Sequence, residues 1–293
     1  MPTEKRVPKL TAAPGFRTLF IPLFRDPLAL IGLILVALIV FSAVLAPHIV
    51  PYDPNKLNVH YRLQAPSGDH LLGTDQLGRD VFSRTIMGSR IALKVALISI
   101  SIASALGLLL GLLAGYGPKW LDNLLIVFFD TVRSFPTVMF ALAVVTLLGP
   151  SLETVILIVI VTSIPVYARM VRTQAQSMKN NEFILAERAM GAGTPRILWF
   201  HMLPNVVGPL LIIASMDIPV VVTIEAGLSF LGLGVRPPTP SWGTILNDGY
   251  SFIRNTPWLV IAGGAPLILT TLGFTFLGEA LRDIFDPKLR KVM

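Results

Sequence analysis

The sequence predicts an all-α integral membrane protein with six transmembrane helices. Hydrophobic residues make up 53% of its 293 residues, charged residues only 14%, and the mean hydropathy is positive. This composition is too apolar for an ordinary soluble protein, so the lipid bilayer is the expected solvent. The apolar residues are also gathered into six runs, each long enough to cross a bilayer as a helix.

The six runs cover residues 28–50, 91–115, 124–148, 152–170, 206–232 and 257–279. A helix of about 20 residues spans about 30 Å, and a helix satisfies its own backbone polar groups inside lipid. The first run lacks a convincing small-residue cleavage site, so we expect it to be retained. The predicted organisation is a tail (1–27), a first helix (28–50), an external loop (51–90), a transmembrane core (91–279) and a second tail (280–293).

Basic residues in the segments between the runs predict the orientation. They are more numerous in the two tails and the 171–205 loop than in the 51–90 and 233–256 loops. Since lysine and arginine favour the cytoplasmic side, we expect a multi-pass protein of the inner membrane with both termini and the 171–205 loop in the cytoplasm. The residues on the expected cytoplasmic side are Lys5, Arg6, Lys9, Arg17, Arg25, Arg172, Lys179, Arg188, Arg196, Arg282, Lys288, Arg290 and Lys291.

Glycines recur every four residues in the second run, at Gly107, Gly111 and Gly115. This spacing places them on one helix face, where another backbone can approach closely. We expect tight helix packing there.

The 171–205 loop has the features of two short helices separated by a break. Asn181 can cap the first helix, Gly191 can end it, and Thr194 followed by Pro195 is typical of the start of a second. Ala186 and Ala189 are small and three residues apart, so one face of the first helix is nearly flat. Such a helix can lie in a groove of a partner protein.

The end of this loop resembles the cytoplasmic motif of the inner-membrane permease subunits of ABC importers. Gly191 is followed by a nine-residue gap and then His201-Met-Leu203-Pro204, which matches the glycine and Leu-Pro spacing of that family. The sequence departs from the family motif at Leu185-Ala186-Glu187, where Glu-Ala-Ala is usual, and at His201, where isoleucine is usual. The resemblance implies that this loop contacts an ATPase through Glu182, Ala186, Glu187, Ala189, Gly191, Leu203 and Pro204.

Three further segments resemble the dipeptide, oligopeptide and nickel permease group, in its C-type subunit. They are residues 70–84 (HLLGTDQLGRDVFSR), residues 228–243 (LSFLGLGVRPPTPSWG) and residues 284–290 (IFDPKLR). In the first of them, Gly73 and Gly78 permit turns, and Asp80 can cap a helix and pair with Arg84 one turn later. We expect a folded external element that either closes the outer face of the subunit or contacts a binding protein.

Four charged residues lie inside the predicted helices, where charge is costly unless it is paired or faces water. Asp130 and Arg133 are three residues apart and can satisfy each other. Asp217 and Glu225 are eight residues apart, about 80° around a helix, so both can face one side of it. These two acids are candidates either for lining a translocation path or for hydrogen bonding between helices.

The sequence lacks the motifs that several other functions require. There is no Gly-x-x-x-x-Gly-Lys-Ser/Thr segment to bind ATP phosphates, no zinc-protease or serine-hydrolase motif, no cysteine, and no basic stripe suited to nucleic acid. The chain is therefore predicted to be neither an enzyme nor a binder of its own cofactor.

The resemblance implies the type I ABC importer fold and a defined set of partners. These are a homologous second permease subunit, two cytoplasmic ATPases that carry ATP and magnesium, an external solute-binding protein and membrane lipid. The expected function is half of the translocation path for di- or oligopeptides or similar small solutes. The alternative is a self-sufficient secondary transporter or channel, which would show inverted repeats or broken spans.

Overall fold

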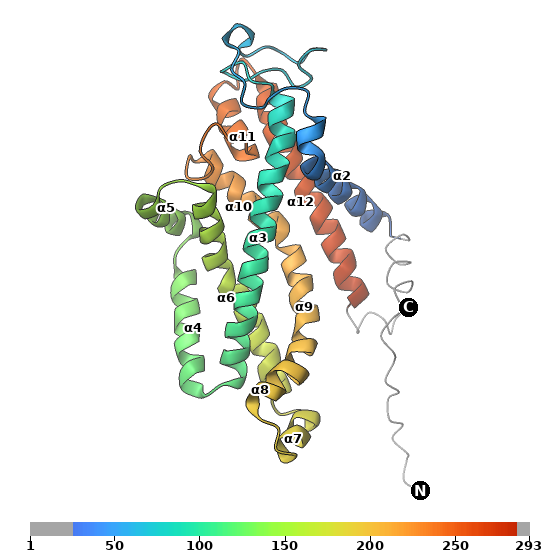
Figure 1. The fold of residues 1–293 in the computed structure, drawn as a ribbon, viewed down its shortest axis with the longest axis vertical. Helices are drawn as coiled ribbons and strands as arrows, with labels where there is room; N and C mark the ends of the chain where they lie inside the picture. Colours follow the sequence, from blue (N-terminus) through green and yellow to red (C-terminus); the bar gives the residue numbers. More distant parts are fainter. Residues whose placement is uncertain (1–25, 286–293) are drawn as a thin grey trace.

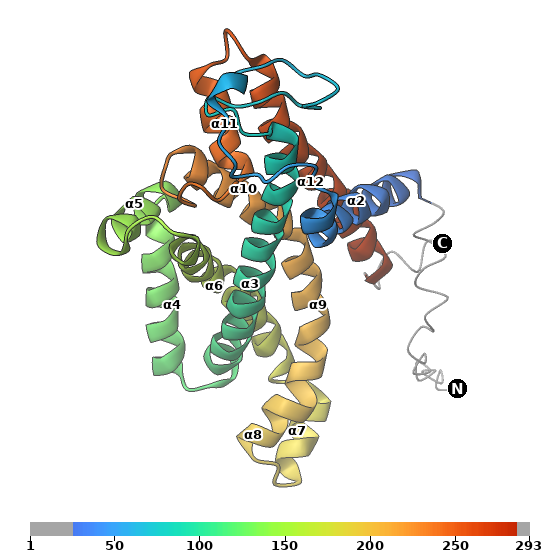
Figure 2. The same ribbon diagram turned by 45° about the horizontal axis from the view of Figure 1, so that its top comes forward.

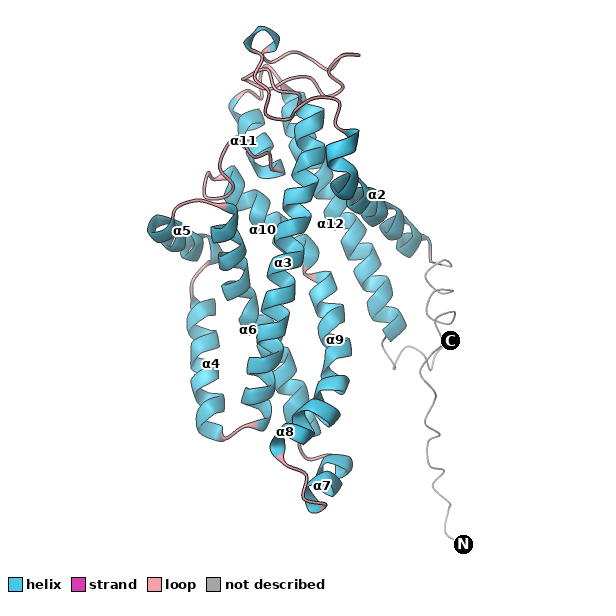
Figure 3. Cartoon of the chain, viewed as in Figure 1, coloured by secondary structure: helices cyan, strands magenta, loops and turns pink. Residues whose placement is uncertain are grey.

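The computed structural model describes residues 26–285, and this part of the chain is helical without a β-strand (Figures 1 and 3). The basic residues expected in the tails 1–25 and 286–293 lie outside the described residues, as does most of the 284–290 segment. The helices are α2 (Pro27–Ile49), η1 (Val59–Tyr61), α3 (Val81–Tyr116), α4 (Lys119–Ser134), α5 (Thr137–Leu148), α6 (Leu152–Met178), α7 (Glu182–Ala189), α8 (Thr194–Arg196), η2 (Ile197–Met202), α9 (Leu203–Met216), α10 (Ile218–Phe230), α11 (Trp242–Ser251) and α12 (Pro257–Phe285).

Within residues 26–285, five helical segments are long and apolar enough to cross a membrane. They are α2, α3, α6, the continuous stretch Thr194–Met216 and α12, and the bent pair α4–α5 meets the same test when it is taken as one span. The count of six predicted from the sequence is therefore reached only by including this bent pair.

Helices α3 and α6 form the centre of the fold, and the glycine stripe of α3 is the reason that they pack closely. A Cβ atom at Gly107 would lie 2.5 Å from the Cβ of Tyr167, and one at Gly111 would lie 2.5 Å from the carbonyl oxygen of Ala168. Both distances are shorter than any real contact between such atoms. The tight packing expected from the glycine spacing is confirmed.

Two of the predicted spans are broken, and a proline explains each break. Helix α4 ends at Ser134, and α5 begins at Thr137 at an angle of 90° to it, because Pro136 keeps Phe135 extended (φ −87°, ψ 130°). The predicted 206–232 helix divides at Asp217 into α9 and α10, since Pro219 lacks the N–H that would bond to the carbonyl of Ser215. The expectation of continuous helices over 124–148 and 206–232 is wrong at these points.

The other differences are in helix length. Helix α3 begins at Val81 and not near residue 91, so the preceding loop ends at Asp80. Helix α6 continues to Met178, eight residues beyond the predicted run. In Figures 1 and 2, residues 51–80 and helix α11 lie at one end of the bundle, while α7, α8 and the α3–α4 connection lie at the other. The 51–90 and 233–256 loops, which were predicted to share one side, therefore lie at the same end, opposite the 171–205 loop (Figures 1 and 2).

Candidate functional site

Helix α7 is the short helix predicted in the 171–205 loop, and it lies beyond the long helices at one end of the molecule (Figure 1). It ends as expected: Gly191 has φ +84°, a left-handed conformation that glycine adopts without strain. The side chain of Asn181 makes no capping hydrogen bond, so that part of the prediction is wrong. The second short helix is not separate either, because α8 continues through the π-helical turn η2 into α9.

Most of α7 is exposed. Ile184 is its one buried residue, and Glu182, Ala186 and Ala189 are all exposed, as are the larger apolar residues Phe183 and Leu185. A surface of this kind is unusual for a short helix that has no partner, because it leaves apolar area in water.

Polar contacts of three side chains attach α7 to the rest of the subunit. Arg188 Nε donates to the phenol oxygen of Tyr116 at 3.0 Å, and its guanidinium lies 5.0 Å from the centre of the same ring. Lys179 Nζ donates to the carbonyl oxygen of Tyr116 at 3.0 Å. On the other side, His201 Nε2 lies 3.4 Å from Glu187 Oε1. The loop is thus bonded to the end of α3 and to η2.

The remaining residues predicted in this loop occupy the start of α9. Leu203 is half-buried, Pro204 is exposed in the first turn, and both follow the η2 turn. Beside them, Pro195, Arg196, Trp199, Phe200 and His201 line an open pocket of about 530 Å³. The structure thus joins α7 to η2 through Glu187 and His201, and Leu203 and Pro204 follow η2 directly.

Asp217 lies at the break between α9 and α10 and lines a pocket of about 230 Å³. Glu225 lies elsewhere: it is 0% exposed, and its Oε1 accepts a hydrogen bond from Ser229 Oγ at 2.7 Å. The two acids lie in the same helical stretch, since the Asp217 carbonyl accepts the N–H of Val221, but Glu225 is buried against Ser229 whereas Asp217 lines the pocket. Of the two acids, only Asp217 is among the residues that line this pocket.

The two acidic residues of α4 pair with arginines of α6. Asp130 is bonded to Arg169 and not to Arg133, so the predicted pair within α4 is wrong. Asp122 pairs with Arg172, whose Nη2 lies 2.8 Å from Oδ2. The spacing of three residues favours Arg133 as the partner of Asp130, but in the structure the guanidinium of Arg169 on the neighbouring helix α6 lies closer.

Residues 51–80, here called the cap, form the folded element that was expected before α3. Gly73 and Gly78 have φ values of +71° and +72°, so both make turns that suit glycine. Asp80 caps α3 by accepting a hydrogen bond from the backbone N–H of Ser83 at 2.7 Å. His70 Nδ1 lies 2.8 Å from the other oxygen of Asp80.

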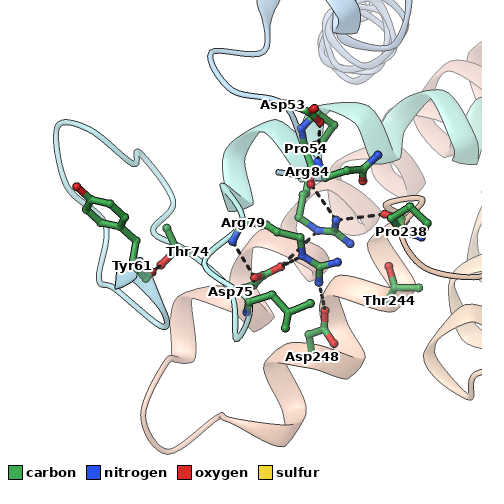
Figure 4. A network of polar contacts seen from close by, with 12 residues as sticks. Asp53, Pro54, Tyr61, Thr74, Asp75, Arg79, Arg84, Pro238, Thr244 and Asp248 are labelled. Carbon is green, nitrogen blue, oxygen red and sulfur yellow. Dashed lines mark hydrogen bonds and ion pairs between the residues drawn. The ribbon is translucent and has the colours of Figure 1, made fainter. Parts of the chain in front are cut away.

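A buried cluster of charges fixes the cap to the helices (Figure 4). Arg79 Nε donates to Asp75 at 2.6 Å, and its Nη2 lies 3.4 Å from Asp248 of α11. The predicted pairing of Arg84 with Asp80 is wrong, because the Asp80 carboxylate already caps α3 and contacts His70. Arg84 lies 3.6 Å from Asp75 instead.

The same cluster joins two segments that are distant in the sequence. Arg84 Nη1 donates to the carbonyl oxygens of Pro54 and Pro238, at 3.0 and 3.3 Å. Trp242 Nε1 donates to the carbonyl of Thr85 at 2.9 Å. Residues 70–84 and 228–243, the two segments singled out in the sequence, therefore form one structural unit.

Comparison with known proteins agrees with this architecture. Residues 107–291 match the model of the binding-protein-dependent transport system inner membrane component family, and residues 16–66 match the N-terminal TM domain of oligopeptide transport permease C. A structure of the MetNI methionine ABC transporter, described as inward facing, has the same fold with a TM-score of 0.57 and 20% identity, over 69% of this chain and 97% of that chain.

Curated relatives cover nearly the whole sequence. The dipeptide transport system permease protein DppC of Alkalihalophilus pseudofirmus is 37% identical over 280 residues, which is 96% of this chain and 92% of the relative. The di/tripeptide transport system permease protein DppC of Pseudomonas aeruginosa is 39% identical, with 89% and 88% covered. The glutathione transport system permease protein GsiD of Pectobacterium atrosepticum is 39% identical, with 91% and 89% covered. The resemblance read from the sequence motifs is thus confirmed: the chain belongs to the binding-protein-dependent transport system inner membrane component family, as an ABC permease of the C type.

Proposed function

We propose that this chain forms half of the translocation path of an ATP-driven importer whose cargo is di- or oligopeptides or similar small solutes. Three of the curated relatives are named for dipeptides, di/tripeptides and glutathione, all of which are short peptides. A homologous second permease subunit would supply the other half, and an external solute-binding protein would deliver the cargo. The protein would lie in the inner membrane with both termini in the cytoplasm.

The energy would come from two cytoplasmic ATPases that bind ATP and magnesium. The observation that carries this proposal is α7, an exposed helix with one buried residue, bonded through Arg188 and Glu187 to the subunit behind it. Its exposed Ala186 and Ala189 leave room for a closely packed partner. Closure of the ATPases would move α7 and switch the path between inward-open and outward-open states.

Substitution of Ala189 by tryptophan tests this contact. Because Ala189 is exposed in the isolated subunit, the larger side chain can point into solvent and is expected to disturb chiefly a docked partner. Overpacking an interface costs about 1 to 3 kcal/mol, or up to about a hundredfold in association. We expect the variant to insert normally but to lose co-purified ATPases or to hydrolyse ATP without uptake. Ser251→Trp, at an exposed position of α11, is the matched control.

Normal ATPase recovery and normal uptake with Ala189→Trp would contradict the proposed contact. The family assignment favours the importer over the alternative, the self-sufficient transporter, although the bent α4–α5 pair is a broken span of the kind that such a transporter contains. Uptake that stops when the proton gradient is collapsed, while ATP is kept constant, would favour that alternative.

A further inference from the structure

The pocket of about 230 Å³ beside Asp217 lies where both helix breaks meet α6. Its wall is formed by the end of α4, the start of α5, the middle of α6 and the first half of α10. The lining residues are Val132, Arg133, Phe135, Thr137, Thr162, Ser163, Val166, Asp217, Val220, Val221 and Ile224. It is a mostly apolar pocket with one acid, one base and three hydroxyl groups.

The acid and the base are the unusual feature. Neither Arg133 nor Asp217 has an ion-pair partner within residues 26–285, although Asp122 and Asp130 of α4 are both paired with arginines of α6. The two groups do not pair with each other, so their charged atoms are more than 4.0 Å apart. Opposite charges in a membrane-spanning region that are left unpaired mark a functional site by default, because each needs a counter-charge or water.

A small molecule that carries both charges can contact the two groups together. An extended chain advances about 3.3 to 3.6 Å per residue, so the ammonium and carboxylate of a dipeptide lie about 7 Å apart. The pocket of about 230 Å³ has the volume of about eight water molecules, at about 30 Å³ each, which is enough for two small residues. The hydroxyl groups of Thr137 and Ser163 can donate to or accept from a peptide group.

We propose that this pocket is a binding site in the path for zwitterionic solutes, with the solute ammonium at Asp217 and its carboxylate at Arg133. The inference rests on the proposed function and deepens it, since it names the chemical class that the path contacts. Neither Asp217 nor Arg133 has an ion-pair partner within residues 26–285, and a zwitterion offers a counter-charge to both at once. A solute with one charge leaves the other unpaired and is bound less tightly.

The test is binding of three probes to the complete complex in nanodiscs, without the binding protein and without nucleotide. The probes are alanyl-alanine, its N-acetyl derivative and its C-terminal amide. We expect each blocked derivative to bind about tenfold more weakly than alanyl-alanine, the effect of one lost charge-assisted contact. Asp217→Asn should remove the preference over the N-acetyl form only, and Arg133→Gln should remove the preference over the amide only. Arg254→Gln, an exposed arginine of the turn before α12, is the matched control.

Three results would overturn the inference. They are equal binding of all three probes to the wild-type complex, no binding of alanyl-alanine at millimolar concentration, and loss of the second permease subunit from the Arg133→Gln complex. The last result would mean that Arg133 pairs across the subunit interface. Uptake of alanyl-alanine into proteoliposomes, measured on the wild type with binding protein and ATP, tests the importer function independently of the binding site. If uptake is normal but the three probes do not show the expected binding preferences, the proposed binding site is wrong and the importer function still stands.

Discussion

The guanidinium of Arg188 in α7 donates a hydrogen bond to the phenol oxygen of Tyr116, the last residue of α3, at 3.0 Å. Lys179 bonds to the carbonyl of the same tyrosine. Tyr116 is therefore the point at which the loop thought to receive the ATPase contacts a helix that crosses the membrane.

Loss of this contact should uncouple ATP hydrolysis from transport. Tyr116→Phe removes the hydrogen bond and keeps the ring under Arg188, while Tyr116→Leu removes both. The hydrogen bond contributes about 1 to 2 kcal/mol and the cation–π contact about 0.5 to 1 kcal/mol at a site of this exposure. We expect the ratio of ATP hydrolysed to solute imported to rise from wild type to Phe to Leu. An unchanged ratio in the leucine variant would contradict this role, and Tyr250→Leu in α11 is the control.

Gly191 ends α7, and the reason for glycine there is its backbone conformation. A Cβ atom at this position would meet nothing within 4 Å, so any cost arises from φ +84° alone. Asparagine tolerates this region and valine does not, with a penalty of about 1 to 2 kcal/mol. We expect Gly191→Val to misplace the α8 segment and impair uptake, while Gly191→Asn retains it. Equal uptake by the two variants in proteoliposomes would show that the turn is not required.

The α3–α6 contact should not accept even a methyl group. Gly111→Ala would place its Cβ 2.5 Å from a backbone oxygen of Ala168, and such overpacking costs about 1 to 3 kcal/mol or more. We expect a lower thermal unfolding temperature in detergent. Gly208→Ala in α9 is the matched control, because its Cβ would meet nothing within 4 Å. A Gly111→Ala protein as stable as the Gly208→Ala protein would be inconsistent with the packing described.

Asp248 in α11 should give a pH-dependent stability difference. Burial raises the pKa of its carboxyl, and the Arg79 guanidinium opposes this only in part. The folded state then favours the neutral form, so the charged form destabilises it at neutral pH, and that penalty disappears as pH falls through the raised pKa. Asp248→Asn should therefore unfold at a higher temperature than wild type near about pH 7, with a smaller gap near about pH 5. If the difference in unfolding temperature between Asp248→Asn and wild type grows as the pH falls, the pKa of Asp248 is not raised by folding.

The orientation can be tested on this cysteine-free chain. Met190 follows α7 with 74% of its surface exposed, and Leu71 of the cap is 57% exposed. In intact cells, an impermeant thiol reagent should label Leu71→Cys and not Met190→Cys, with both labelled after lysis. Labelling of Met190→Cys in intact cells would place the loop outside the cytoplasm.

The sequence was sufficient to locate the apolar runs and the α7 loop, because hydropathy and the Gly191 spacing are local signals. The breaks were missed although Pro136 and Pro219 lie within the predicted runs. Hydropathy counts proline as one more residue of an apolar run and takes no account of its missing backbone N–H, which interrupts the helix. The early start of α3 lies outside the apolar run because residues 81–90 mix apolar residues with Arg84, Arg90 and hydroxyl residues, although Asp80 is recognisable from the sequence as a candidate helix cap.

The charged residues show where sequence reasoning ends. Asp130 was assigned to Arg133 by spacing, but its partner Arg169 is 39 residues away on the adjacent helix. Because Asp130 pairs with Arg169, Arg133 has no acidic partner in α4 and lines the pocket with Asp217. Nothing in the linear sequence indicates which of two arginines a carboxylate will choose, since the choice depends on how α4 leans against α6.

Helix α3 has 36 residues, and at about 1.5 Å per residue it is about 54 Å long, compared with about 30 Å for the hydrocarbon of a bilayer. Its first residue follows Asp80 in the buried charge cluster of the cap, and its last residue is the tyrosine beside α7. A displacement applied at either end therefore reaches the other through one uninterrupted row of backbone hydrogen bonds, without passing through a loop that would absorb it.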